Sequence, residues 1–129
     1  MIPKFRAWDK NNKYMEYTDK NLVVCFSDEG ASAVDHTTFG HSCTCMEDIE
    51  LMQSTGLRDI NGTEIYEGDI VRYNRGISWS VEKFPYVVKN SMEGFVFEYG
   101  LIQHSLSKKI EYVTVIGNIY ENPELLEDN

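Results

Sequence analysis

Four side chains that could bind a metal ion lie close together in the first half of the sequence: His36, His41, Cys43 and Cys45. Imidazole nitrogen and thiolate sulfur are the ligands of tetrahedral zinc sites. The spacing argues against zinc, because Cys-x-Cys is tighter than the usual pair and no second pair follows at zinc-finger distance. We therefore expect these four residues to lie on a solvent-exposed loop, with a metal site as the less favoured alternative.

Cys25 is the remaining cysteine and the one candidate thiol nucleophile. A catalytic thiolate needs a neighbouring base and electropositive surroundings. Cys25 instead lies in an apolar run, residues 22–26, which favours a neutral, buried thiol. No serine and histidine are arranged as in a catalytic triad, and no glycine-rich loop suited to phosphate is present. We expect no catalytic site, no enzymatic activity and no cofactor.

Four carboxylates surround two glycine-containing turns: Asp59, Glu64, Glu67 and Asp69. Paired carboxylates can transfer protons or bind a hard cation. Acidic residues beside glycine are also common in turns, where a carboxylate oxygen accepts hydrogen bonds from nearby main-chain N–H groups. The spacing lacks the alternating ligands of an EF-hand loop. We therefore expect turn and surface roles for these carboxylates.

Aromatic residues are numerous, and they could either fill a core or contact a partner. Seven of them stand out: Trp8, Tyr14, Tyr17, Tyr66, Tyr73, Trp79 and Tyr120. On small barrels such residues can stack on bases or grip proline-rich peptides, but small barrels also need aromatic side chains as filling. We expect most to be core residues and name Trp8, Tyr66, Tyr73 and Trp79 as candidates for partner binding, with Trp79 the most exposed.

The charge of the chain limits the partners it can attract. Twelve basic and 21 acidic residues give a formal net charge of −9, and a polyanion such as DNA repels an acidic chain. The first twenty residues are locally basic, through Lys4, Arg6, Lys10, Lys13 and Lys20. We keep nucleic-acid association, through this basic hairpin and the aromatics or through acidic mimicry of phosphates, as the alternative to protein binding.

The elements that must position these residues read as short strands. Residues 4–17 alternate apolar and polar side chains around a turn at 10–12, which predicts a hairpin. Residues 22–26 are short and apolar enough for a buried strand. Residues 27–45 are rich in small and polar residues, and we expect a mobile loop or insertion there, or a poorly ordered hairpin. A strand is favoured at 50–54, ended by Thr55 and Gly56.

The centre of the chain contains two glycine turns. Asn61-Gly62 between two extended runs predicts a hairpin with a type I′ turn, in which both residues take positive φ. Glu67-Gly68-Asp69 predicts a second turn, which leads into a strand at 70–73. Two further strands, 84–89 and 94–99, are joined by four residues.

The last third of the chain predicts a long strand and a short helix. Residues 110–120 alternate as a strand would, and Gly117 within them indicates a bulge or a close backbone approach. Asn122 has the chemistry of a helix N-cap, followed by Pro123 at the first helical position. Short strands, tight turns and a single core predict a mainly β, small barrel with an N-terminal hairpin and a short C-terminal helix. We expect one domain over residues 1–129.

Three segments of the chain resemble one known family. They are Lys4-Phe-Arg-Ala-Trp-Asp-Lys10, the glycine-punctuated stretch Leu51–Arg72, and Val115-Ile-Gly-Asn-Ile-Tyr-Glu-Asn-Pro-Glu-Leu-Leu126. In this order they closely resemble the YopX proteins, small proteins encoded by phages and prophages. The resemblance covers nearly the whole chain, with no family pattern at 27–45 and a loose match at 76–109. It implies a mainly β, SH3-like barrel fold and a phage setting, and it supplies no catalytic residues.

These observations together predict an accessory protein that acts by binding. We expect a non-enzymatic protein-interaction or self-assembling β module, with a protein partner or a copy of itself, as a homo-oligomer. No run approaches the ~20 apolar residues that span a bilayer, so no membrane association is expected. The start of the chain lacks the apolar region of a signal peptide. Three cysteines, an odd number, fit reduced thiols, and we expect the cytoplasm of a bacterial host.

Overall fold

The protein is mainly β, as predicted, and its computed structural model divides the chain into two compact units, Met1–Gln53 and Ser54–Asn129. The structure describes residues 4–11, 13–17, 22–27, 30–38, 42–46, 49–74 and 84–127, with the backbone alone at 22–27, 30–38 and 42–46. All strand pairs in these ranges are antiparallel and form sheets of four, five and three strands.

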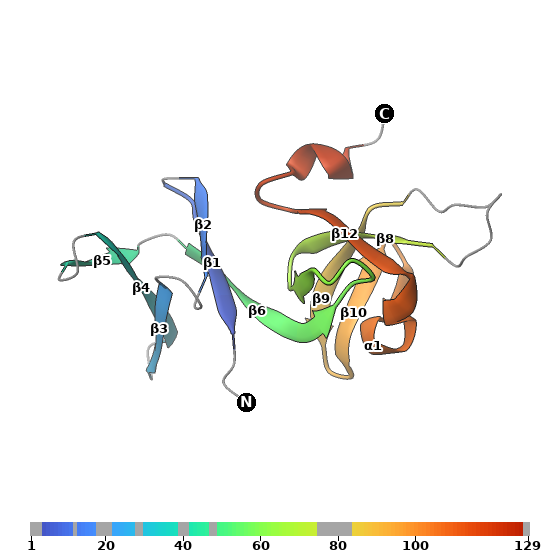
Figure 1. Ribbon diagram of the computed structural model, residues 1–129, viewed down its shortest axis with the longest axis horizontal. Coiled ribbons are helices and arrows are strands. Elements are labelled where there is room, and N and C mark those ends of the chain that lie inside the picture. Colours follow the sequence, from blue (N-terminus) through green and yellow to red (C-terminus); the bar gives the residue numbers. More distant parts are fainter. Residues whose placement is uncertain are drawn as a thin grey trace. The chain divides into compact units, whose positions relative to one another are not determined.

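Unit 1 begins with the predicted hairpin. Strands β1 (Phe5–Asp9) and β2 (Tyr14–Tyr17) pair from Arg6 opposite Tyr17 to Asp9 opposite Tyr14 (Figure 1). Lys13 closes the turn with a φ of 58° and donates its N–H to the Asp9 carbonyl oxygen at 2.8 Å. β1 lies between β2 and β6, and four of its five residues are buried. The polar residues Arg6 and Asp9 are buried along with Ala7 and Trp8, although the alternation in the sequence is typical of a strand with one face in water.

The backbone at residues 30–38 and 42–46 corrects the prediction of a loop over 27–45. Strand β3 (Leu22–Ser27) pairs with β4 (Gly30–Thr38), and β4 pairs with β5 (Ser42–Met46), which makes a three-stranded sheet. Of the alternatives, a hairpin describes the β4–β5 pair and an unpaired loop does not, while the prediction of an insertion stays a prediction. Main-chain pairing needs no large side chains, so the lack of apolar residues there was a poor guide.

Strand β6 (Ile49–Arg58) continues from unit 1 into unit 2. Its first half pairs with β1, and its second half pairs with β7 (Glu64–Tyr66) after a register shift between Ser54 and Arg58. The prediction that Thr55 and Gly56 end the strand is wrong. Gly56 has a φ of 78°, and its N–H donates to Ser54 Oγ at 3.1 Å, while Thr55 Oγ1 donates to the Ile65 carbonyl oxygen at 2.7 Å. These side-chain hydrogen bonds stabilise β6 and β7 at the bulge, where the regular register is interrupted.

The β6–β7 turn is a hairpin turn of another type than predicted. Gly62 has a φ of 84°, whereas Asn61 has no positive φ, so the type I′ turn is wrong. The Gly62 N–H donates to the Asp59 carbonyl oxygen at 3.0 Å, and the Asp59 N–H donates to the Thr63 carbonyl oxygen at 2.9 Å. This pattern fits a type I turn followed by a left-handed glycine, the usual form of a three-residue hairpin loop.

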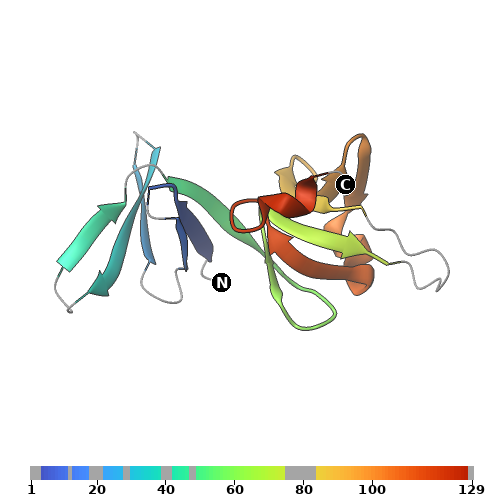
Figure 2. The ribbon, with the colours of Figure 1, turned by 90° about the horizontal axis from the view of Figure 1, so that it is seen from above.

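Unit 2 is built on a five-stranded sheet that curls into a half-barrel (Figures 1 and 2). Its strands are β8 (Asp69–Tyr73), β9 (Tyr86–Ser91), β10 (Gly94–Tyr99), β11 (Ile102–Ser105) and β12 (Val113–Asn118). Their order in the sheet is β11-β10-β9-β8-β12. The helix α1 (Leu106–Lys109) and the 3-10 turn η1 (Ile110–Tyr112) connect β11 to β12. The predicted β9–β10 hairpin is confirmed.

The predicted strand at 110–120 is shorter in the structure, because residues 110–112 form η1. The predicted irregularity at Gly117 is confirmed by a register shift between Val115 and Gly117. The predicted C-terminal helix is the single 3-10 turn η2 (Pro123–Leu126), and Asn122 makes no side-chain capping bond there. Asn122 Oδ1 instead accepts the N–H of Asn118 at 3.1 Å.

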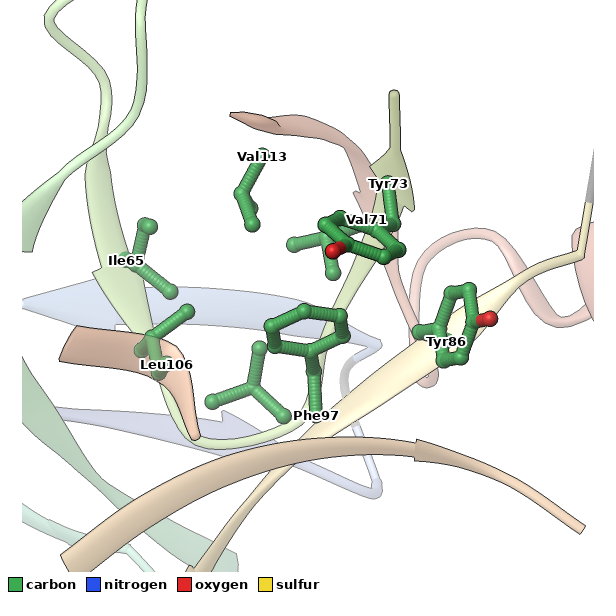
Figure 3. Packing of buried hydrophobic residues seen from close by; sticks show 8 residues of the cluster. Ile65, Val71, Tyr73, Tyr86, Phe97, Leu106 and Val113 are labelled. Atoms are coloured by element: carbon green, nitrogen blue, oxygen red, sulfur yellow. The ribbon is translucent and has the colours of Figure 1, made fainter. Parts of the chain in front are cut away.

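The core of unit 2 lies inside the curled sheet. Eight buried side chains make up this cluster: Ile65, Val71, Tyr73, Tyr86, Val88, Phe97, Leu106 and Val113. Figure 3 shows Ile65 from β7 and Leu106 from α1 beside the sheet residue Phe97. β7 and α1 therefore supply apolar side chains that the concave face of the sheet packs against. Unit 1 has a smaller cluster in which Tyr14, Ile49 and Leu51 surround Ala7.

Candidate functional site

Asp59 and Asp69, two of the four carboxylates around the glycine turns, have the predicted turn role but are buried rather than at the surface. Asp59 is buried, and its Oδ1 accepts the N–H groups of Asn61 and Thr63, each at 2.9 Å. Its Oδ2 accepts the N–H of Val115 in β12, also at 2.9 Å. Both oxygens are thus engaged by main-chain donors, so this carboxylate fastens the β6–β7 turn to the edge of the five-stranded sheet.

Asp69 also accepts a main-chain N–H group, whereas Glu64 contacts other side chains. Asp69 is buried, and its Oδ2 accepts the Tyr66 N–H at 2.8 Å across the Glu67-Gly68 turn. Gly68 has a φ of 84°, donates its N–H to the Val88 carbonyl oxygen and accepts the Ile119 N–H, both at 2.9 Å. This turn leads from β7 in one sheet to β8 in another. Glu64 Oε2 accepts the hydroxyl of Ser54 at 2.6 Å.

Three of the four aromatic candidates for partner binding are buried. Trp8 is 8% exposed, Tyr66 6% and Tyr73 2%, and Trp79 lies outside the described residues. Tyr73 is buried because β8 lies between β9 and β12 and its ring faces the concave side. A role for these residues in partner binding stays a prediction. For the three buried rings, contact with a partner would require the surrounding structure to open.

An aromatic cluster instead connects the core of unit 2 to its surface. His104 of β11 lies with its ring centroid 4.8 Å from Tyr73 and 5.1 Å from Phe97. Tyr86 meets Phe97 edge to face at 5.2 Å. Such tilted and edge-to-face contacts are the favoured geometries of aromatic pairs. His104 is half-buried, so it covers this end of the core.

The exposed end of the cluster is an apolar patch formed by Phe84, Tyr99, Leu101 and Ile102. The rings of Phe84 and Tyr99 are stacked, with centroids 4.7 Å apart and planes 8° apart. Leu101 is fully exposed in the turn between β10 and β11, and Phe84 and Ile102 are each 42% exposed. The sequence contained a usable signal for the exposure of Leu101, because a leucine in a two-residue turn beside Gly100 has no strand neighbour to cover it.

The opposite face of β9, β10 and β11 carries a row of polar side chains. Lys89 Nζ lies 2.6 Å from Glu98 Oε1, and Gln103 Nε2 donates to Glu98 Oε2 at 3.2 Å. The bonds from Lys89 and then Gln103 lower the pKa of Glu98 below its ordinary value, against a smaller opposing effect of burial. The three side chains form a row across the strands, on the face opposite the apolar patch.

Some of the basic side chains predicted to form a surface on the N-terminal hairpin are ion-paired or buried within unit 1. Lys10 Nζ lies 2.7 Å from Glu50 Oε1. Arg6 is 3% exposed, so its charge is not presented to solvent. Lys4 and Lys13 are exposed. Of the five cations expected to act together in this stretch, three are at the surface, including the ion-paired Lys10, while Arg6 is buried and Lys20 lies outside the described residues.

The side chains of Cys25, His36, Cys43 and Cys45, and all of His41, lie outside the described residues. In the part of the chain that the structure describes, no three His, Cys, Asp or Glu side chains gather as a metal ion would require. None of the described helices combines the length and the apolar character needed to cross a bilayer.

Comparison with known families decides the affiliation of the chain. The family model described as YopX protein matches residues 4–127. The chain belongs to the YopX family. This confirms the resemblance seen in the three sequence segments and extends it through residues 27–45, where the sequence had shown no family pattern.

Two solved structures resemble this YopX-family chain along nearly its whole length. Protein EF1440 from Enterococcus faecalis is 31% identical, with a TM-score of 0.63, over 98% of this chain and 99% of that one. Protein yopX from Bacillus subtilis is 24% identical, with a TM-score of 0.73, over 100% and 99%. The latter likeness concerns the fold alone. The comparison with curated proteins finds no match.

Proposed function

We propose that this YopX-family chain is a non-enzymatic interaction module of phage or prophage origin, which acts by docking on another protein or on a copy of itself. The observation that carries the proposal is the apolar patch on unit 2. The rings of Phe84 and Tyr99 stack there, Ile102 lies opposite Tyr99 in the neighbouring strand, and Leu101 is fully exposed in the adjoining turn. Exposed aromatic and aliphatic residues that cluster beside a sheet edge are typical of binding surfaces.

The chemistry of the turn carboxylates supports a role without catalysis or a cofactor. General acid–base catalysis needs a carboxylate within reach of a substrate proton. Asp59 and Asp69 are buried and directed at main-chain N–H groups, so they serve the fold. We extend the proposal to the bacterial cytoplasm, which the odd number of cysteines supports. We also propose that unit 2 is SH3-like, which its curled antiparallel sheet around one core supports.

Nucleic-acid association remains the alternative proposal. The exposed lysines of the N-terminal hairpin are its support, and the net charge of −9 opposes it. Binding through lysines would weaken steeply with salt. A gel shift at low ionic strength that shows no complex with DNA or RNA would remove this alternative.

Affinity purification from host cells tests the docking proposal. Tagged wild-type protein is compared with a Phe84→Ser/Leu101→Ser double variant and with the matched control Ile60→Ser/Met92→Ser, which removes exposed apolar side chains elsewhere. We expect a stable partner, or the untagged copy of the protein, to be retained by the wild type and the control and lost from the patch variant. The proposal fails if the wild type retains neither, or if all three proteins retain the same partner equally.

A further inference from the structure

The two edges of the five-stranded sheet differ in how they are covered. At the β12 edge, the Val115 N–H donates to Asp59 Oδ2 at 2.9 Å, and the Ile60 N–H approaches the Val113 carbonyl oxygen at 3.4 Å. The bulge at Gly117 also interrupts the strand there. Side-chain covering and bulges are the devices by which proteins keep a sheet edge from pairing. This edge is therefore closed to another strand.

The β11 edge has none of these devices. β11 pairs on one side with β10 in continuous register, and among the described residues no strand lies beyond it. Its four residues are Ile102, Gln103, His104 and Ser105. They include no proline, no lysine and no acidic residue, which are the side chains that usually protect an edge.

The turn before β11 determines which main-chain groups face outward. Gly100 has a φ of 60° and forms a two-residue turn with Leu101 between the paired residues Tyr99 and Ile102. In such a hairpin the residues that flank the turn exchange hydrogen bonds with each other, and the pattern then alternates. The N–H and C=O groups of Gln103, and two residues later the N–H of Ser105, consequently point away from β10, whereas the Ser105 C=O begins the hydrogen bonds of α1.

We propose that the outer edge of β11 pairs antiparallel with the same edge of a second copy, across a two-fold axis, and joins two five-stranded sheets into one. The inference rests on the proposed function and names the partner and the strand. Each copy contributes the same edge of β11 to the pairing, as an isologous two-fold contact requires. The exposed side chains of Leu101 and Ile102 lie at the same edge and would lose contact with water.

Charge favours a second copy at this place. Two chains of net charge −9 repel each other over most of their surfaces. β11 carries no acidic residue, and it is followed in α1 by Lys108 and Lys109, neither of which makes an ion pair within the described residues. Antiparallel pairing places each α1 beside the β10–β11 turn of the other copy. The two pairs of lysines are then at opposite ends of the contact and do not face each other.

A proline at position 103 tests the pairing. Gln103→Pro removes an outward N–H without breaking a bond to β10, and proline is tolerated in edge strands. We expect sedimentation and light scattering to show a dimer for the wild type and a dissociation constant raised at least about tenfold by Gln103→Pro, since two symmetry-related hydrogen bonds are lost. Gln103→Ala removes the same side chain, keeps the N–H and is expected to dimerise.

A second variant covers the case in which the proline chain does not fold. Ile102→Lys places a charge on the edge and leaves the main chain intact, and we expect it to be monomeric with a native near-ultraviolet circular dichroism spectrum. A monomeric wild type overturns the inference, as does a folded Gln103→Pro or Ile102→Lys protein that dimerises like the wild type. If the wild type is monomeric and still retains a host protein through its apolar patch, the proposed function stands without this inference.

Discussion

Asp59 connects parts of unit 2 that are 56 positions apart in the sequence. Its carboxylate accepts two N–H groups within its own turn and one in β12. The sequence predicted a turn role for this residue and assigned the turn geometry to Asn61 and Gly62. The long-range bond to Val115 leaves no local pattern, because it depends on where the chain returns.

Asp59→Ala removes the acceptor for all three N–H groups. Burying donors without partners costs about 1–3 kcal/mol each, and water can satisfy some of them, so we expect the free energy of unfolding to fall by roughly 2–4 kcal/mol. Denaturant unfolding followed by fluorescence measures it. The control Glu93→Ala, at an exposed turn, is expected to change stability by less than about 0.5 kcal/mol. Equal stability of the two variants would contradict the role given to Asp59.

Gly117 is required for steric reasons rather than for its backbone angles. An added Cβ would lie 2.6 Å from Asn122 Oδ1 and 2.9 Å from Leu125 Cδ1. We expect Gly117→Ala to lower the free energy of unfolding by about 1–3 kcal/mol, as overpacking does. Thermal unfolding of a double-mutant cycle with Asn122→Gly measures the coupling. Strictly additive effects would show that the clash with Asn122 is not the cause.

At the scale of elements, the polar row across β9, β10 and β11 makes a small contribution that depends on pH. Lys89 and Gln103 lower the pKa of Glu98 in the folded protein. A carboxyl whose pKa is depressed by folding stabilises the fold above its unfolded pKa, roughly 4.3. That contribution is lost as the pH falls through the lower, folded pKa.

Glu98→Gln removes this titration from the sheet. We expect the difference in stability between wild type and variant to be largest near neutral pH, below about 1 kcal/mol because the pair is partly exposed. The difference should shrink as the pH falls below roughly 4.3. Urea unfolding of both proteins between neutral and acid pH measures it. A difference that stays constant, or grows in acid, would contradict the assignment.

The elements that could be predicted from the sequence are those held by local pairing. The β1–β2 and β9–β10 hairpins and the bulge at Gly117 all followed from alternation and turn residues. The strands β4 and β5 did not, because their small and polar side chains carry little periodic signal. The apolar patch was also missed, since Phe84 and Tyr99 become neighbours only when β9 and β10 pair.

At the scale of the whole molecule, the division into two compact units invites a direct test. All eight residues of the larger core cluster lie between Ile65 and Val113, within the second unit. We expect a fragment of residues 54–129 to fold alone, with lower stability than the full chain because it lacks the first half of β6. Near-ultraviolet circular dichroism and cooperative thermal unfolding would report this, whereas a fragment without cooperative unfolding would support the single domain predicted from the sequence.

The covering of β12 by Asp59 and Ile60 limits how far this sheet can grow by adding strands from other molecules. Amyloid fibres grow because every added strand offers a new free border to the next one. A sheet that can pair along one border only has no free border left once two molecules have paired. Growth along this sheet would therefore terminate at a pair, which allows the chain to keep a bare strand border without the hazard of polymerisation.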